Sequence, residues 1–259
     1  MSAAKKPAAA AQHKLSILIP CYNEFAHLNT VIDTLRATAF PCPVEMVIVD
    51  DGSTDGTREV MRQLEGSPDL RIVYHPYNQG KGAALRTAIA HATGTVCIVQ
   101  DADLEYNPAE IARVIAPILA GQADVVYGSR FRPSVERLQT PERVHYFSHF
   151  IANMGLTFLS NLLTNLNLSD METCYKAFRA EVLKAMQVEE NRFGFEPEIT
   201  ARVGSWRPKL RVYEVGISYQ GRTYEEGKKI GLKDGLRALW CIAKYNTWGR
   251  HNGAKNLKG

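Results

Sequence analysis

The stretch TVCIVQDAD, residues 95–103, places two carboxylates directly after a near-continuous apolar run. The run at residues 96–99 lacks polar alternation, which favours a strand buried on both faces, as in a parallel sheet. Ligand sites in open α/β sheets lie beyond the carboxyl ends of such strands. Asp101 and Asp103 are hard oxygen donors that suit Mg²⁺ or Mn²⁺, and Glu105 follows as a third. A turn or helix cap explains an isolated D-x-D equally well, so the rest of the chain must decide.

Strand and helix patterns alternate through the first half of the chain. The strand patterns lie at residues 15–19, 44–49, 70–74, 95–100 and 123–127, and the helical patterns at 25–39, 55–64, 82–91 and 108–120. Such alternation predicts an α/β fold with a mostly parallel sheet and helices on both faces. The second half is less regular, and we expect an extension of the same domain.

Composition narrows the class of protein. The 259 residues and 45% hydrophobic content are ordinary for a globular chain. A net charge of +4 is too small to indicate a nucleic-acid partner, but it is compatible with anionic phosphates or an acidic membrane surface. The five cysteines form no C-x-x-C pair, so neither a zinc site nor a disulfide framework is expected. A reducing cytoplasm is the simplest location.

The two ends of the chain are polar. Residues 1–14 lack the apolar core of a signal peptide and are expected to be a disordered tail, and residues 247–259 form a second polar tail. The longest segment without formal charge, residues 144–169, contains four asparagines. A helix that spans a bilayer would not tolerate so many amides, so we expect no membrane-spanning helix here.

Polar motifs follow the other predicted strands as well. PCYNE at residues 20–24 follows the first strand, and DDGSTDG at residues 50–56 follows the second. An acidic, glycine-rich turn can hold a base or a ribose through its aspartates, although a solvated turn has the same composition. NQGKG at residues 78–82 matches neither a P-loop nor a dinucleotide fingerprint. It is either a tight turn that opens a helix or a contact to ribose or diphosphate.

Taken in order, these motifs resemble a known family. PCYNE, VIVDDGSTDGT, YNQGKGAALRTAIAHATG, VQDADLEYNP and VYGSR resemble the family 2 glycosyltransferases, which have the GT-A (Rossmann-like) fold. SDMETCYKAFR, GFEPEI and EVGISYQGRTYEEGKK are similar to the branch that makes polyprenyl-phosphate sugars, typified by dolichyl-phosphate mannose synthases. The resemblance implies one GT-A domain over residues 15–246, with a nucleotide-sugar half (15–130) and an acceptor-side half (131–246) that ends in amphipathic helices.

The resemblance also implies donor and metal ligands. Asp50 and Asp51 are the expected base and ribose contacts, and Arg222 with Lys228 or Lys229 resembles a basic loop that closes over the diphosphate. The full donor set is Pro20, Tyr22, Glu24, Asp50, Asp51, Lys81, Asp101, Asp103, Arg222 and Lys228. The implied ligands of Mg²⁺ or Mn²⁺ are Asp101, Asp103 and Glu105.

Basic residues after the fifth strand are implied to hold the acceptor phosphate. They are Arg130 and Arg143 together with Ser148, although the spacing from Ser148 to Asp170 is longer than in the mannose synthases. Bidentate guanidinium groups suit a phosphate better than lysines do. The residues assigned to catalysis itself are Asp103, Arg130 and Arg143.

The resemblance implies a metal-dependent, inverting hexose transfer to polyprenyl or dolichyl phosphate. The donor is a UDP-sugar, such as UDP-glucose or UDP-N-acetylhexosamine, or GDP-mannose. An attacking phosphate is already an anion and needs no general base. A glycan or small-alcohol acceptor is the alternative, and it would require a carboxylate base, for which Asp170 is the candidate. A non-catalytic nucleotide-sugar sensor is disfavoured because Asp101, Asp103, Arg130 and Arg222 are all present.

Two amphipathic segments bear on the acceptor. On a helical wheel over residues 144–169, one face carries Phe147, Ile151, Met154, Phe158 and Leu162, and the opposite face carries Asn153, Thr157, Ser160, Asn161 and Thr164. The apolar face either lies in a membrane interface or packs on the sheet. Residues 230–245 place Leu236, Leu239, Trp240 and Ile242 opposite Lys233, Arg237 and Lys244. We expect peripheral association with the cytoplasmic face of a membrane, directly or through an anchoring partner or homo-oligomer.

Overall fold

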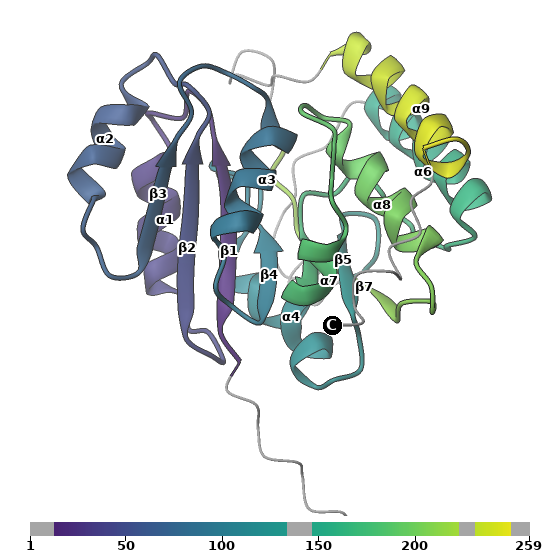
Figure 1. Ribbon diagram of the computed structural model, residues 1–259, viewed down its shortest axis with the longest axis horizontal. Coiled ribbons are helices and arrows are strands. Elements are labelled where there is room, and N and C mark those ends of the chain that lie inside the picture. Colours follow the sequence, from purple (N-terminus) through teal and green to yellow (C-terminus); the bar gives the residue numbers. More distant parts are fainter. Residues whose placement is uncertain (1–12, 134–146, 223–230, 250–259) are drawn as a thin grey trace, which may run out of the picture.

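A seven-stranded sheet forms the centre of the molecule in the computed structural model, which describes residues 13–133, 147–222 and 231–249 (Figure 1). The strand order is β3-β2-β1-β4-β6-β5-β7. The strands are β1 (Leu15–Cys21), β2 (Val44–Asp50), β3 (Leu70–Tyr74), β4 (Val96–Val99), β5 (Val125–Ser129), β6 (Lys176–Arg179) and β7 (Val212–Gly216). All five strands predicted in the first half are present, with small differences at their ends.

Strand β6 runs antiparallel to both of its neighbours, β4 and β5, whereas every other neighbouring pair in this sheet is parallel. The prediction of a mostly parallel sheet is therefore confirmed. Because β6 is reversed, the residues that precede it lie at the same edge as the carboxyl ends of β1, β2, β4 and β5. The topology brings segments from both halves of the chain to the edge where α/β folds bind ligands.

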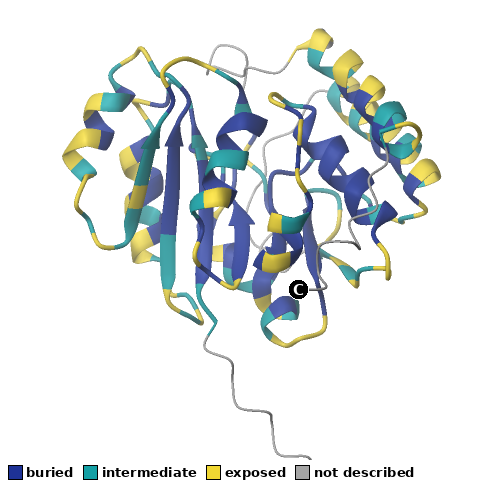
Figure 2. Cartoon of the chain, viewed as in Figure 1, coloured by how far each residue is buried: buried dark blue, intermediate teal, exposed yellow. Residues whose placement is uncertain are grey.

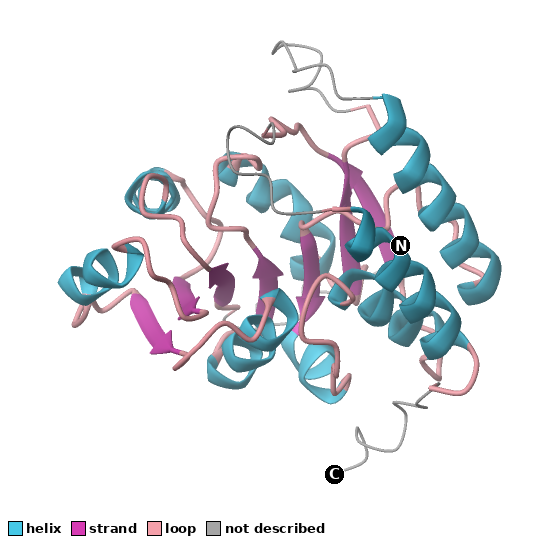
Figure 3. Ribbon diagram, turned by 90° about the horizontal axis from the view of Figure 1, so that it is seen from above, coloured by secondary structure: helices cyan, strands magenta, loops and turns pink. Residues whose placement is uncertain are grey.

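Helices cover both faces of the sheet. In Figure 1, α3 and α7 lie in front of the strands and α1 lies behind them, and Figure 3 shows helices on both sides of the sheet. The helices are α1 (Leu28–Ala37), α2 (Thr57–Leu64), α3 (Lys81–His91), a 3₁₀ turn η1 (Pro108–Glu110), α4 (Ile111–Leu119), α6 (Phe147–Thr164), α7 (Ala180–Ala185), α8 (Phe195–Ser205) and α9 (Leu232–Asn246). The predicted α/β layering is confirmed.

Helix α1 begins three residues later than the pattern predicted, because the preceding segment binds the turn after β2. The backbone N–H of Glu24 donates to the hydroxyl of Thr57 (3.0 Å), and that of Phe25 donates to Asp55 (3.1 Å). These bonds keep the segment in an irregular conformation at the carboxyl end of β1. The loops after the first two strands are thereby joined.

One cluster of buried apolar side chains runs from Leu15 to Ile217. Every residue of β4 is buried, as its apolar run predicted. Figure 2 shows the buried strands between helices whose outer faces are exposed. The part of the chain that the structure describes thus has a continuous core on which the edge loops rest.

A third layer of helices lies beyond the sheet. Helix α8 is buried along most of its length, and Tyr127 of β5 contacts Thr200 of α8 through their hydroxyl oxygens (3.0 Å). Helices α6 and α9 pack on α8 and on each other (Figure 1). The sequence pattern did not predict β6, α7, α8 or β7. A helix buried on all sides has no polar stripe to reveal its period.

Helix α6 is inverted relative to an ordinary surface helix. Its side chains buried against the protein are hydroxyls: Thr157 is 4% exposed and Ser160 only 1%. Phe158 is 70% exposed, and the same face also presents Phe147, Ile151, Met154 and Leu162. The predicted division of α6 into an apolar and a polar face is therefore correct. The alternative in which the apolar face packs on the sheet is wrong, because that face is exposed.

Hydrogen bonds explain why the polar face of α6 turns inward. The hydroxyl of Thr157 accepts from the backbone N–H of Met171 (3.1 Å), and the Asn161 amide exchanges two bonds with the backbone of Leu168 (2.7 and 3.1 Å). The Asn153 amide donates to Asp170 (3.2 Å). Thr157 and Asn161 thereby satisfy irregular backbone before β6, which would otherwise be buried without partners.

Helix α9 differs in part from its prediction. Leu236, Leu239 and Trp240 are exposed as one apolar strip, but Ile242 is fully buried instead of joining them. Its buried side packs Cys241 and Tyr245 against α8, together with Ala201. In the described part of the chain, no helix combines the length and apolarity that crossing a bilayer would require.

Candidate active site

A cavity of about 260 Å³ lies at the carboxyl edge of the sheet. Of the residues predicted to bind the donor, those that line it are Pro20, Tyr22, Glu24, Asp51, Lys81, Asp101, Asp103 and Arg222. Other lining residues include Cys21, Asn78, Gly80, Glu105, Arg192, Phe193 and Tyr219. Segments that are far apart in the sequence therefore meet in the place that the D-x-D argument required.

Acidic side chains dominate this cavity. Burial, reinforced by the neighbouring Asp101 and Glu105 carboxylates, raises the pKa of Asp103 to about 7. Burial also raises the pKa of Asp101, but Lys81 more than offsets it, so that the pKa falls below its ordinary value. Arg222 also lowers the pKa of Asp103, but it does not offset the burial of that carboxyl and the repulsion from its two acidic neighbours. The cavity is therefore suited to an added cation.

Two basic side chains already neutralise part of this charge. Lys81 Nζ lies 2.9 Å from an oxygen of Asp101 and 3.1 Å from an oxygen of Glu196, the second residue of α8. Burial lowers the pKa of Lys81, but these two carboxylates raise it well above its usual value. Arg222 lies 2.7 Å from Asp103 and 3.2 Å from Glu24. Each D-x-D carboxylate thus has an internal cation as its partner.

The predicted metal ligands do not form a closed coordination set. No group of three or more His, Cys, Asp or Glu side chains within the described ranges is arranged to hold a metal ion. Glu105 instead accepts from the Tyr219 hydroxyl and from the backbone N–H of Arg222, both at 2.8 Å. The hard oxygens of Asp101 and Asp103 still fit Mg²⁺ or Mn²⁺, which proteins often bind through one or two carboxylates with water and phosphate completing the shell.

The two aspartates after β2 occupy different places. Asp51 lines the cavity, and its carboxylate accepts from the backbone N–H groups of Gln79 (2.9 Å) and Gly80 (2.7 Å). Asp50 is fully buried, is not among the cavity residues and forms an ion pair with Arg58 (Nε–Oδ2 2.8 Å). Of the predicted pair, only Asp51 is positioned to meet a ligand in this conformation.

Arg130 is held by a buried carboxylate. Its Nε and Nη2 donate to the two oxygens of Asp170 at 2.7 and 2.8 Å, and its guanidinium lies over the ring of Tyr219 (5.0 Å). Burial raises the pKa of Asp170, but Arg130 lowers it by more, so the pKa falls below its ordinary value and the carboxylate stays ionised. Both of its oxygens are engaged and it has no exposure to solvent. This geometry is poorly suited to the general-base role considered for Asp170.

The glycines of NQGKG make room for a neighbouring loop. A Cβ on Gly80 would lie 2.3 Å from the carbonyl oxygen of Asn191, and one on Gly82 would lie 2.1 Å from that of Glu190. Gly80 also has φ of +100°, which side chains rarely adopt. The tight-turn reading is thus supported, and the same turn carries Lys81 into the cavity.

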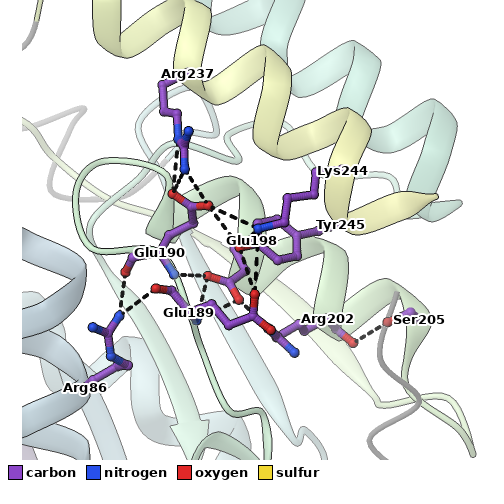
Figure 4. A network of polar contacts seen from close by, with 9 residues as sticks. All are labelled: Arg86, Glu189, Glu190, Glu198, Arg202, Ser205, Arg237, Lys244 and Tyr245. Atoms are coloured by element: carbon purple, nitrogen blue, oxygen red, sulfur yellow. Dashed lines mark hydrogen bonds and ion pairs between the residues drawn. The ribbon is translucent and has the colours of Figure 1, made fainter. Parts of the chain in front are cut away.

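The loop between α7 and α8 forms a wall of the cavity that the sequence did not predict. It contributes Arg192 and Phe193 to the cavity. Figure 4 shows how it is anchored: Arg86 of α3 donates to the carbonyls of Glu189 and Glu190 (2.9 Å each), and Glu198 of α8 accepts from the backbone N–H of Glu190 (2.7 Å). GFEPEI carried a family signal, but no local motif marked the residues before it.

The acceptor-side predictions are less complete. Ser148 lies in the exposed first turn of α6 and is not among the residues that line the cavity. The ring of Phe150, in the same turn, contacts Phe131 (5.3 Å), which brings this turn next to the segment that follows β5. Arg143, Lys228 and Lys229 lie outside the described residues.

Comparison with known proteins gives sugar-transferring relatives. The chain is 27% identical over 242 residues to UDP-N-acetylglucosamine–dolichyl-phosphate N-acetylglucosaminyltransferase of Methanococcus voltae, with 87% of this chain and 93% of the relative covered. It is also 27% identical to dodecaprenyl-phosphate galacturonate synthase of Rhizobium johnstonii (87% and 64% covered) and to undecaprenyl-phosphate mannosyltransferase of Micrococcus luteus (83% and 86%).

Solved structures share the fold. Glucosyl-3-phosphoglycerate synthase from Mycobacterium tuberculosis, crystallised with Mn²⁺, UDP and phosphoglyceric acid, aligns with a TM-score of 0.68 at 20% identity, over 92% of this chain and 80% of that one. Another structure of the enzyme from M. tuberculosis aligns with a TM-score of 0.62 at 21% identity, over 90% and 79%. The expected GT-A-like architecture is therefore confirmed.

The family follows from the sequence match. Residues 16–186 match the family described as Glycosyl transferase family 2, which covers more than half of the chain and includes the strand-end motifs of the cavity. The enzyme class expected from those motifs is confirmed by this match and by the glycosyltransferases among the relatives. The chain belongs to glycosyl transferase family 2 and is a glycosyltransferase.

Proposed function

We propose that the protein transfers a hexose from a nucleotide diphosphate sugar to a polyprenyl phosphate. The observation that carries the lipid acceptor is the inverted helix α6, which presents its large apolar side chains outward beside the segment that follows β5. The named activities of the M. voltae, R. johnstonii and M. luteus relatives support the same acceptor class. The donor is a UDP-sugar or GDP-mannose.

The acidic cavity supplies the donor side of the reaction. Asp101 and Asp103 would hold Mg²⁺ or Mn²⁺, which when bound offsets the negative charge on the departing diphosphate. Asp51, Glu24 and Tyr22 line the same cavity and are the proposed contacts to the nucleoside. Lys81 and Arg222 must exchange part of their present ion pairs for the phosphates. These ion pairs already hold both cations at the cavity before a ligand arrives.

The transfer itself is a single displacement. An oxygen of the lipid phosphate forms a bond to the anomeric carbon while the bond from that carbon to the diphosphate oxygen breaks, which inverts the configuration. The nucleophile is an anion, so no proton has to be removed. Arg130 is the proposed positioning group for this phosphate, with Arg143 and Ser148 as further proposed contacts. The engaged, ionised Asp170 supports this reading over a base-assisted attack by an alcohol.

Transfer can be tested with a defined set of reagents. Purified protein is incubated with Mn²⁺ or Mg²⁺, a short polyprenyl phosphate and a panel of UDP-sugars and GDP-mannose, and mass spectrometry detects a lipid-linked hexose. The dephosphorylated polyprenol serves as the matched acceptor control and should give no product. Turnover on a non-lipid acceptor without any lipid product would overturn the proposal.

We further propose that α6 and α9 lie on the cytoplasmic face of an anionic bilayer. Exposed Leu236, Leu239 and Trp240 of α9 extend the apolar face of α6. Arg237 lies over the Trp240 ring (4.1 Å) and Lys244 beside it (4.8 Å). Tryptophan with adjacent basic side chains suits the headgroup region.

Vesicle flotation tests this placement. Wild type should float with vesicles that contain anionic lipid, and Phe158→Ser with Leu162→Ser should lower the bound fraction by about tenfold or more, since each large apolar side chain contributes about 1.5–3 kcal/mol on burial. Phe25→Ser, at an exposed apolar residue outside this face, is the control. If wild type does not bind vesicles but forms a homo-oligomer that the α6 substitutions dissociate, the face is instead a contact with a second copy.

A further inference from the structure

The side chain of Arg192 is held at the wall of the cavity. It lies on the loop between α7 and α8 and lines the cavity beside Lys81 and Asp101. Its Cγ lies 2.8 Å from the point where a Cβ on Gly80 would stand, so the glycine leaves the space in which the arginine stem rests. The side chain as a whole is exposed. Arg192 is therefore both open to solvent and part of the cavity lining.

The loop that carries Arg192 is fixed from three sides. Glu198 of α8 accepts from the backbone N–H groups of Glu189 (2.9 Å) and Glu190 (2.7 Å) (Figure 4). The backbone N–H of Ala83 in α3 donates to the carbonyl of Asn191 (3.0 Å). Helix α9 adds Arg237, whose guanidinium donates to the Glu190 carboxylate (2.9 and 3.0 Å). Such anchoring limits the conformational entropy that ligand binding by this loop would cost.

The charges of the cavity single out Arg192. Lys81 is bound by Asp101 and Glu196, and Arg222 is bound by Asp103 and Glu24. Within the described residues, the Arg192 side chain makes no hydrogen bond or ion pair, although it shares the cavity with both of these cations. An exposed guanidinium that lacks a carboxylate partner can accept an incoming anion without first breaking an ion pair.

We propose that Arg192 binds the diphosphate of the nucleotide-sugar donor. The assignment rests on the proposed function, because it presupposes such a donor. A guanidinium binds phosphate oxygens in a bidentate manner, and hydrogen bonds of this kind are stronger than those between neutral groups. The donor phosphates are favoured over the acceptor phosphate because Arg192 shares its cavity with Asp51, Asp101 and Asp103, whereas Arg130 is not among the lining residues.

Calorimetric titration of UDP and of GDP in the presence of Mn²⁺ tests the assignment. For the nucleotide that wild type binds, Arg192→Gln should raise the Kd by about 10- to 100-fold, the range expected for loss of hydrogen bonds to a charged group. Arg192→Lys keeps the positive charge but loses the bidentate guanidinium, so its Kd should fall between those of wild type and Arg192→Gln. Arg62→Gln removes an exposed arginine of α2 and should bind as wild type does. Urea unfolding should be unchanged in all three variants.

The outcomes separate the two proposals. An unchanged Kd in Arg192→Gln, alongside nucleotide binding by wild type, overturns the assignment of Arg192 alone. An unchanged Kd combined with a raised KM for the lipid acceptor overturns it in favour of the acceptor phosphate. Failure of wild type to bind either nucleoside diphosphate overturns the proposed donor class, and the role of Arg192 with it.

Discussion

Helices α3 and α6 obey opposite rules of burial within one molecule. Helix α3 buries Ala84, Leu85 and Ala88 against the sheet in the usual manner. Helix α6 buries Thr157 and Ser160 and exposes phenylalanine. The difference shows that a stripe of apolar residues defines the two faces of a helix but not which of them meets the protein. Hydrogen bonds to irregular backbone can outweigh the burial of a single apolar face.

The largest expected effect lies at the cavity, which adjoins the conventionally packed helix α3. Asp103→Asn should lower kcat/KM for sugar transfer by about 10²- to 10³-fold, the usual cost of losing one electrostatic contact to a departing anion. Asp69→Asn, which breaks an exposed pair with Arg36, is the matched control and should retain activity. Steady-state rates with varied donor measure both. An Asp103 variant that keeps wild-type rates would remove the D-x-D pair from the mechanism.

Two identical substitutions compare the helices directly. Gly82→Ala in α3 forces a Cβ to within 2.1 Å of the Glu190 carbonyl and should lower the free energy of unfolding by about 1–3 kcal/mol. Gly155→Ala in α6 meets nothing within 4 Å and should raise it by about 0.5–1 kcal/mol, because alanine favours a helix. Urea denaturation measures the two signs. Equal effects would show that the loop does not press on α3 as described.

Adjacent residues of α6 test the inversion itself. Thr157→Val leaves the backbone N–H of Met171 without its acceptor and should destabilise the fold by about 1–3 kcal/mol, although valine is more apolar. Phe158→Ser removes a large exposed ring and should change stability by no more than about 0.5 kcal/mol. Thermal unfolding of both variants without lipid is the measurement. A larger loss for Phe158→Ser would mean that its ring packs against the protein in solution.

The sequence predicted the strands of the first half well because their signals are local. Apolar runs ended in polar motifs, so β4 and the places of Asp101, Asp103 and Glu24 followed from periodicity and the family resemblance. The pairing of Arg130 with Asp170 and the wall formed by Arg192 depend on long-range contacts that no local pattern records. Ile242 was misplaced because one helical wheel cannot show that α8 covers part of α9.

Glu172, which precedes β6 in the second half of the chain, makes the stability of the fold depend on pH. Its Oε1 atom is buried without a hydrogen-bond partner in the described structure, and burial with the charge of Glu196 raises its pKa to about 8. The folded protein then holds a proton that the unfolded chain releases above its ordinary value of 4.5, so this group makes stability fall as pH rises from about 4.5 to about 8. Glu172→Gln should remove that slope, which is at most about 1.4 kcal/mol per pH unit. Urea unfolding of both proteins at several pH values within this window is the measurement, and parallel stability curves would show that Glu172 is ionised in the folded state.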